Sequence, residues 1–275
     1  MPDDLPTSQA GAPAFDAHAA GYDARAGFPP GAGQAVAEAI VGLAGVGAND
    51  LVLELGAGTG EIGAHLAALT TGYVGLDNSP AMLEIFRAKA SPAMPRLLVA
   101  DVDVIWPLPA SSAHVIFASR VIHLLRSEHV VSEVTRVCQP GGYVMLGRIN
   151  RDPDSLKERL RRHRQQVLRD LGIQPRQGEA GSRQVIERLT EAGWFDLGRQ
   201  AVATWTGDIS AGEILAEWAT LSRMGSVEVE RVTRELILDD IRGWTAREFG
   251  DLDRPWPYHE QYVLDIVQLP ERRNA

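Results

Sequence analysis

Apolar and polar positions in the first part of the chain follow a strand, turn and helix order. An apolar run at residues 51–55 is followed by glycine at every second position of 56–60, and then by apolar residues at helical spacing over 61–69. Aliphatic residues favour strands, whereas alternate glycines cannot hold one. The pattern predicts a strand, a tight turn and a helix whose first N–H groups a ligand can approach, because glycine has no Cβ to block it.

The same alternation continues to about residue 150. Further strands are predicted at four apolar runs, residues 73–77, 96–100, 113–119 and 143–147. Amphipathic spacing predicts helices over 32–43 and 81–89, and Asn78, Ser79 and Pro80 precede the second as capping and first-turn residues. Alternating strands and helices predict an α/β protein with a doubly wound, mostly parallel sheet.

A different pattern begins after residue 150. Residues 154–168 predict a basic helix capped by Asp152 or Asp154. Its apolar stripe consists of Leu156, Leu160, Val167 and Leu168. We interpret the arginines of this helix as a solvated face, with an anion site as the alternative. Later helices are predicted at 181–192, 210–222 and 227–249, and later strands at 197–205 and 259–267.

These patterns divide the chain into core and cap segments. Long connections between the elements of a compact fold are usually lids or binding elements. We expect a disordered tail at 1–13, a core with an N-terminal lid helix at 14–150, a helical cap segment at 151–180, a return to the core at 181–206, a second cap segment at 207–254 and a final core strand at 255–270.

Composition narrows the classes of partner. A net charge of -9 and a pI near 5.3 over 275 residues argue against nucleic-acid and anionic-membrane partners. The single cysteine, Cys138, is predicted to be a half-buried structural thiol on the helix before Pro140. The histidines lack metal-ligand spacing, so no metal is expected. Without a signal-like or membrane-spanning apolar run, we expect a cytoplasmic protein.

Several landmarks in order resemble a known family. They are residues 54–60 (Glu-Leu-Gly-Ala-Gly-Thr-Gly), residues 76–83 (Leu-Asp-Asn-Ser-Pro-Ala-Met-Leu), Asp101 and residues 140–142 (Pro-Gly-Gly). Together they resemble the class I S-adenosylmethionine-dependent methyltransferases, in particular the small-molecule branch of methyltransferase 11/25 or ubiquinone-biosynthesis-like proteins. The resemblance covers about residues 14–150. It implies a seven-stranded sheet with a helical cap, S-adenosylmethionine as cofactor and S-adenosylhomocysteine as product.

Two acids and the glycine turn carry most of the expected cofactor site. Backbone at Gly56, Ala57 and Gly58 can approach the methionine part of the cofactor, and Asp77 at a strand end can accept its ribose hydroxyls. Asp101 is expected at the adenine amine, in preference to Asp103.

The resemblance adds further cofactor contacts. It implies that the N–H of Val102 meets the adenine ring and that Met82 packs on its face. It also places Tyr22 and Arg25 over the cofactor, where either can bind the methionine carboxylate. Glu54, Asn78 and Ser119 complete the expected cofactor-binding residues.

The acceptor pocket is expected between the glycine turn and the cap. Its expected lining is His123, Arg148, Trp218 and Trp244. His123 follows the fourth strand and can act as a proton acceptor in catalysis, or it can simply pack near the sulfonium or bond to backbone. The tryptophans can likewise fill the interface between cap and sheet.

The sequence favours methyl transfer to an O, N or C atom of a small organic molecule. A nucleic-acid methyltransferase is disfavoured because Ala118-Ser-Arg-Val121 replaces the expected Asn/Asp-Pro-Pro-aromatic turn. A nicotinamide-dependent oxidoreductase is disfavoured because Glu61 stands where the dinucleotide fingerprint needs glycine. A binding protein that keeps the cofactor site without catalysis stays open, as do the acceptor's identity and a monomeric or dimeric state.

Overall fold

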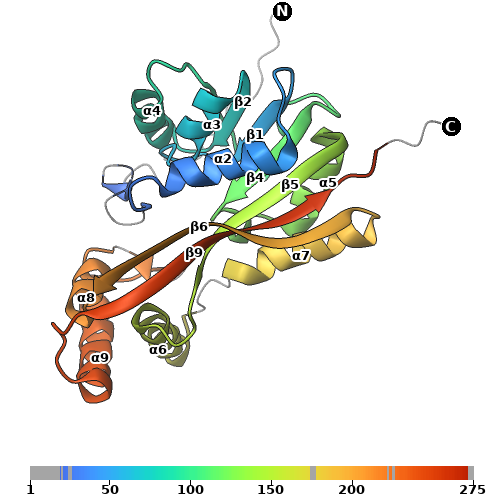
Figure 1. Cartoon of the computed structure of the whole chain (residues 1–275). Coiled ribbons are helices and arrows are strands. Elements are labelled where there is room, and N and C mark those ends of the chain that lie inside the picture. Colours follow the sequence, from blue (N-terminus) through green and yellow to red (C-terminus); the bar gives the residue numbers. More distant parts are fainter. Residues whose placement is uncertain are drawn as a thin grey trace, which may run out of the picture.

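A twisted seven-stranded sheet forms the centre of the protein (Figure 1). The computed structural model describes residues 19, 21–23, 27–173, 178–221, 223–224 and 227–271. The strand order is β3-β2-β1-β4-β5-β9-β6. The strands are β1 Leu51–Leu55, β2 Gly72–Asp77, β3 Arg96–Val99, β4 Ala113–Ser119, β5 Cys138–Arg151, β6 Phe195–Ile209 and β9 Trp256–Gln268. Strands β1 to β5 pair in parallel and β9 is antiparallel to both neighbours, which confirms the predicted mostly parallel sheet.

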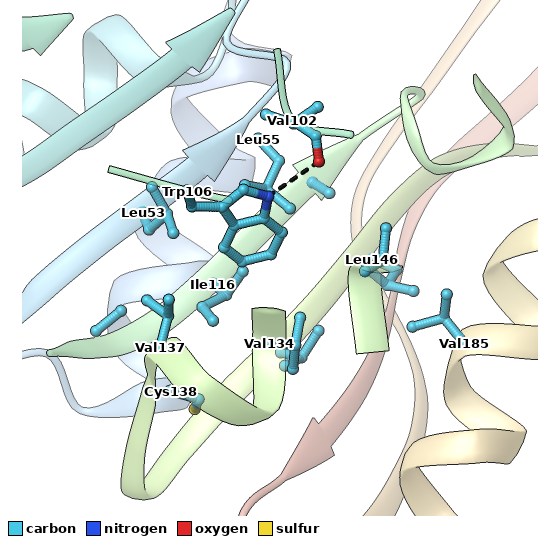
Figure 2. Close-up of a cluster of buried hydrophobic side chains, with 14 of the residues drawn as sticks. Leu53, Leu55, Val102, Trp106, Ile116, Val134, Val137, Cys138, Leu146 and Val185 are labelled. Carbon is cyan, nitrogen blue, oxygen red and sulfur yellow. Dashed lines mark hydrogen bonds between the residues drawn. The ribbon is translucent and has the colours of Figure 1, made fainter. Parts of the chain in front are cut away.

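Helices cover both faces of the sheet, as a doubly wound fold requires. One face carries α2 Ala32–Ala44, α3 Gly63–Leu69 and α4 Pro80–Lys89, and the other carries α5 Ser127–Val137 and α7 Gly178–Glu191. Figure 2 shows the core beneath the second face, where Trp106 packs among Leu53, Ile116 and Val134. Strands buried on both faces are continuous apolar runs, and this is why they were visible in the sequence.

A third hydrophobic cluster lies apart from the sheet and joins three helices. These are α6 Leu156–Asp170, α8 Ala211–Ala219 and α9 Arg231–Phe249. We call these helices, with the short hairpin of β7 Arg223–Met224 and β8 Val227–Glu228, the cap. Helix α6 follows β5, α8 follows β6, and α9 precedes the antiparallel β9. The cap therefore lies beyond the carboxyl ends of the parallel strands, at the lower left of Figure 1.

Strands β6 and β9 extend past the rest of the sheet to reach the cap. Strand β5 pairs with β9 only as far as Arg151, opposite Glu260, whereas β6 and β9 stay paired to Ile209 and Trp256. Residues 206–209 and 256–259 thus form a two-stranded ribbon that connects the sheet to the cap. At its base, the buried Glu260 carboxylate accepts hydrogen bonds from Arg151, Lys157 and Trp205.

Several local predictions were wrong at element ends. Ser155, rather than Asp152 or Asp154, caps α6 and accepts a hydrogen bond from the N–H of Glu158. Helix α9 begins at Arg231 rather than at 227, because Val227–Glu228 pairs with Arg223–Met224. Because α6 begins at Leu156, Ser155 rather than either acid occupies the capping position, where its short side chain reaches the third helical N–H.

Cys138 does not lie on a helix. Helix α5 ends at Val137, and Cys138 opens β5 opposite Ala113 of β4. Its side chain is fully buried rather than half-buried, and this burial raises the pKa of its thiol to about 12. A thiol with so high a pKa stays protonated and unreactive at neutral pH, so the structural interpretation of Cys138 is supported.

Candidate functional site

The glycine loop between β1 and α3 is shaped by left-handed backbone. Gly56, Gly58 and Gly60 have φ angles of 65°, 54° and 79°, which residues with a Cβ rarely adopt. A Cβ on Gly56 would also lie 2.7 Å from the side chain of Val121, and a Cβ on Gly60 would lie 2.5 Å from that of Phe86. At Gly58 the nearest atom to a Cβ would be 3.9 Å away. The Gly58 edge of the loop is therefore open, and a ligand can approach the backbone there.

Asp77 stands at the carboxyl end of β2, against this loop. Its Oδ2 accepts the N–H of Gly58 at 2.8 Å, and its Oδ1 accepts the N–H of Ser79 at 2.9 Å. Ser79 in turn caps α4, accepting the N–H of Met82 at 3.2 Å. The carboxylate is thus fixed in orientation beside the open edge of the loop, the place expected for a group that holds ribose hydroxyls.

Glu54 points into the protein, beneath the loop. It is 3% exposed and accepts a hydrogen bond from the buried hydroxyl of Tyr73. Burial raises the pKa of the Glu54 carboxyl to about 8, the Tyr73 hydrogen bond lowers it, and the charge of Asp77 raises it further. Glu54 is therefore mostly protonated at neutral pH. Although it was predicted to bind the cofactor, its side chain lies in the protein interior.

The segment before α2 lies on the glycine loop. Asp23 accepts a hydrogen bond from Thr59 at 2.5 Å and forms an ion pair with Lys89 of α4. The N–H of Phe28 donates to Glu61 at 2.8 Å. Tyr22 is half-buried nearby, and Arg25 lies outside the described residues. These contacts bring the N-terminal segment to the place where the sequence predicted a lid.

An ion pair between Glu61 and Arg120 joins the loop to the end of β4. Their side chains meet at 2.6 Å, and the Arg120 guanidinium lies 4.6 Å from the centre of the Phe28 ring. Arg120 has a φ of 56°, a conformation unusual for a residue with a side chain and frequent at functional sites. In the sequence, we interpreted Glu61 only as evidence against a dinucleotide site. An acidic residue within a glycine loop also indicates that a cation lies opposite it, and this signal pointed to Arg120.

Ser119 is the last residue of β4 and faces another aromatic side chain. Its hydroxyl accepts a hydrogen bond from Tyr262 at 2.6 Å. Tyr262 reaches across Gly147 of β5, where a Cβ would overlap its ring. The Tyr262 ring also contacts Phe28 with centroids 5.3 Å apart. Through Tyr262, Ser119 at the carboxyl end of β4 is therefore connected to the N-terminal segment.

The residues predicted for the adenine side lie on neighbouring turns. Asp101 is exposed after β3, and its Oδ1 accepts the N–H of Asp103 at 2.8 Å. Asp103 accepts the N–H of Arg126 at 2.9 Å, and Asp101 lies nearer the end of β3 at Val99. Val102 is buried, and its carbonyl accepts the indole N–H of Trp106 at 3.0 Å, as Figure 2 shows. Met82 is buried on α4, and Asn78 is exposed.

The residues predicted for the acceptor pocket lie in different surroundings. His123 is half-buried in the short helix η2 Ile122–Leu124, which packs against α7. Arg148 forms an ion pair with Asp265 of β9. Trp218 and Trp244 belong to the cap cluster. The structure thus places His123 just beyond the carboxyl end of the central strand β4 and both indoles in the cap.

Candidate metal sites and membrane-spanning helices are both absent from the described ranges. No group of three or more His, Cys, Asp or Glu side chains in them is arranged to hold a metal ion. None of the described helices is long and apolar enough to cross a membrane.

Comparison with known proteins identifies the core. Residues 53–146 match a family model described as a methyltransferase domain. An uncharacterized methyltransferase of Mycobacterium tuberculosis is 34% identical over 95 residues, which cover 34% of this chain and 38% of the relative. The malonyl-[acyl-carrier protein] O-methyltransferase of Serratia marcescens is 28% identical over 144 residues, covering 52% of this chain and 54% of the relative. The matches thus span about half or less of the length of these relatives.

Solved structures show the same fold. A putative type II methyltransferase from Anaeromyxobacter dehalogenans aligns with a TM-score of 0.57 at 19% identity, over 89% of this chain and 100% of that chain. At this identity the alignment bears on the fold alone, and it agrees with the seven-stranded α/β architecture.

Proposed function

Because the chain carries a class I methyltransferase domain over residues 53–146, we propose that this protein binds S-adenosylmethionine and methylates an O, N or C atom of a small organic molecule. The observation that carries the proposal is the pairing of the open Gly58 edge with Asp77, 2.8 Å from the Gly58 N–H to the carboxylate. A left-handed glycine allows close approach of a ligand, and an acid fixed beside it suits a ribose. The buried Met82 on the following helix supplies an apolar surface at the same end.

The bound cofactor would supply an activated methyl group on a sulfonium sulfur. Transfer of this methyl group to the acceptor needs the acceptor to be aligned and water to be excluded, and the protein provides both. The contacts of Asp23 with Thr59 and of Phe28 with Glu61 keep the N-terminal segment against the loop. The cap lies beyond the same strand ends, so we place the acceptor between the cap and the glycine loop.

The acceptor class follows from the charge of the chain and from the cap. A net charge of -9 disfavours nucleic acid, whose phosphates need a basic surface. Sites for small molecules are mostly apolar and concave and frequently lie between structural units. A small-molecule acceptor is therefore the proposal that the chain supports best.

Replacing Asp77 by alanine tests the cofactor site. We expect the affinity for S-adenosylhomocysteine to fall by about 1.5–3 kcal/mol, the range for hydrogen bonds to a charged group. Isothermal titration calorimetry measures this loss. Asp196→Ala is the matched control, because Asp196 also accepts a nearby backbone N–H, that of Gly198 at 2.8 Å, but on the edge strand β6. Equal affinity in wild type and Asp77→Ala, or heat from nicotinamide dinucleotide, would contradict the proposal.

Replacing His123 by glutamine tests whether this residue accepts a proton from the acceptor. We propose that it does, since it lies just beyond the carboxyl end of β4. Turnover with any acceptor that supports it should then fall about 100-fold or more, with unchanged affinity for S-adenosylhomocysteine. His129→Gln, on α5 with its ring bonded to the Val104 carbonyl, should leave turnover as in wild type. A loss of only a few-fold in His123→Gln would show that His123 packs rather than reacts.

A further inference from the structure

An arginine occupies the buried stripe of α6. Leu156, Leu160 and Leu168 recur at four-residue or eight-residue spacing and are buried in the cap cluster. Arg164 stands midway between Leu160 and Leu168 and therefore on the same helical face. The sequence placed the arginines of this helix on a solvated face, and for Arg164 that expectation was wrong. Its side chain is partly buried against α8 instead.

The guanidinium of Arg164 lies against an aromatic ring and forms no ion pair with any described residue. Its carbon lies 4.0 Å from the centre of the Trp218 ring, a cation–π contact. Its Nε is buried without a hydrogen-bond partner, and within the described ranges no carboxylate forms an ion pair with it. Burial lowers the pKa of Arg164 to about 10, the charge of Arg161 lowers it further, and that of Glu217 raises it. Arg164 therefore carries a charge that the nearby carboxylate of Glu217 offsets only in part, and among the described residues its Nε has no hydrogen-bond partner.

The other stacked arginine of α6 is different. Arg159 also lies over an aromatic ring, 4.5 Å from the centre of Phe249, but it forms an ion pair with Glu248 of α9. Arg161 is paired with Glu158 on its own helix at 2.7 Å. Arg159 and Arg161 thus each pair with a carboxylate, whereas Arg164 forms no such ion pair with any described residue.

Stability alone does not account for an arginine at this position. Burying a charge without a partner is costly, and an apolar residue would continue the leucine stripe at lower cost. Residues that break the local pattern without structural gain are expected at functional sites. A guanidinium fixed against an indole presents a planar set of N–H donors, which match the two oxygens of a carboxylate.

We propose that Arg164 and Trp218 form the subsite that binds a carboxylate group of the methyl acceptor. This inference rests on the proposed function, and it assigns an organic acid as the acceptor class. The cap that holds the pair lies beyond the carboxyl ends of the parallel strands, the end at which the glycine loop and His123 also lie. Trp218, predicted as a wall of the acceptor pocket, then acts as the surface that orients the guanidinium.

The first test uses benzoate as a probe on the full-length protein. The Nε–H resonance of Arg164, assigned by its loss in Arg164→Gln, should shift saturably with benzoate and not with uncharged benzamide. Arg164→Gln should weaken benzoate binding about tenfold or more, the range for a hydrogen bond to a charged group. Arg159→Gln, the matched stacked arginine, should bind benzoate as wild type does. Benzoate binding that is absent in wild type, or unchanged in Arg164→Gln, overturns the proposal, as does an Arg164-dependent response to inorganic phosphate alone.

The second test separates binding from a structural role. Arg164→Leu should unfold at or above the wild-type temperature while losing benzoate binding, since leucine continues the stripe. A large fall in the unfolding temperature would show that Arg164 is structural and would overturn the proposal. S-adenosylhomocysteine should bind Arg164→Gln as tightly as wild type. If it fails to bind even wild type, the proposed function fails, whereas the benzoate result still decides the carboxylate site.

Discussion

Replacing Glu54 by glutamine is expected to stabilise the protein relative to wild type by an amount that grows with pH, up to several kcal/mol. Burial raises the pKa of Glu54 from 4.5 to about 8 in the folded protein. Between these values the unfolded chain releases its proton and the folded chain keeps it, so the folded state of the wild type loses stability as the pH rises through this window. At about 1.4 kcal/mol per pH unit, the full window amounts to roughly 5 kcal/mol. Glutamine has no proton to release, and it removes this dependence.

Urea unfolding at pH 5, 7 and 8.5 measures the effect. We expect the difference in unfolding free energy between Glu54→Gln and wild type to grow with pH in favour of the variant. Glu128→Gln is the control. The pKa of Glu128 is lowered by a backbone hydrogen bond and then by the charge of Arg188, so ionised Glu128 stabilises the fold and this stabilisation is lost at acid pH. Glu128→Gln should therefore destabilise the protein relative to wild type, the opposite sign to Glu54→Gln. A difference that stays constant between pH 5 and 8.5 would show that Glu54 is ionised in the folded protein.

The second large effect is expected at Gly63, the first residue of α3. A Cβ at this position would overlap the Glu54 carboxyl and the Tyr73 hydroxyl and would lie 2.7 Å from the ring of Phe86. All three side chains are buried, and the first two are hydrogen-bonded to each other. Gly63→Ala therefore both overpacks the core and breaks a buried polar pair, with an expected loss of about 3 kcal/mol or more.

Gly42→Ala is the matched control for this substitution. Gly42 is exposed on α2, and no atom lies within 4 Å of its would-be Cβ. Alanine should stabilise the helix there by about 0.5–1 kcal/mol, because glycine loses more backbone freedom on folding. If the space around Gly63 decides the outcome, chemical denaturation should show that Gly63→Ala lowers the free energy of unfolding and that Gly42→Ala raises it. Equal stability of Gly63→Ala and wild type would mean that the Glu54–Tyr73 pair can move away.

The sequence predicted the parts of this protein in which local and long-range preferences agree. The strand at 113–119 and the helix after Ser79 and Pro80 were located correctly, because apolar runs, capping and proline geometry all favour one arrangement. The seven-stranded sheet then followed from the order of the elements and the family resemblance.

The sequence could not predict side-chain partners that come from distant segments. The Glu61–Arg120 ion pair joins residues far apart in the chain, and the Glu54–Tyr73 pair depends on the parallel register of β1 and β2. The same limit applies to Arg164, since helical spacing shows its face but not what packs there. Cys138 was assigned to the wrong element because α5 ends and β5 begins between Val137 and Cys138, and the sequence pattern does not locate such a boundary to one residue.

The ribbon that connects sheet and cap has a mechanical consequence. Residues 206–209 and 256–259 are paired only with each other, and a ribbon of this kind twists more readily than a strand held on both sides. Bending in the plane of the ribbon would break its hydrogen bonds, whereas torsion about its long axis would keep them. If the cap moves to admit an acceptor, the cheapest motion is therefore a rotation about this axis, with the Glu260 cluster as its fixed pivot. The acceptor entrance would then widen by swivelling the cap sideways across the strand ends rather than by lifting it away from them.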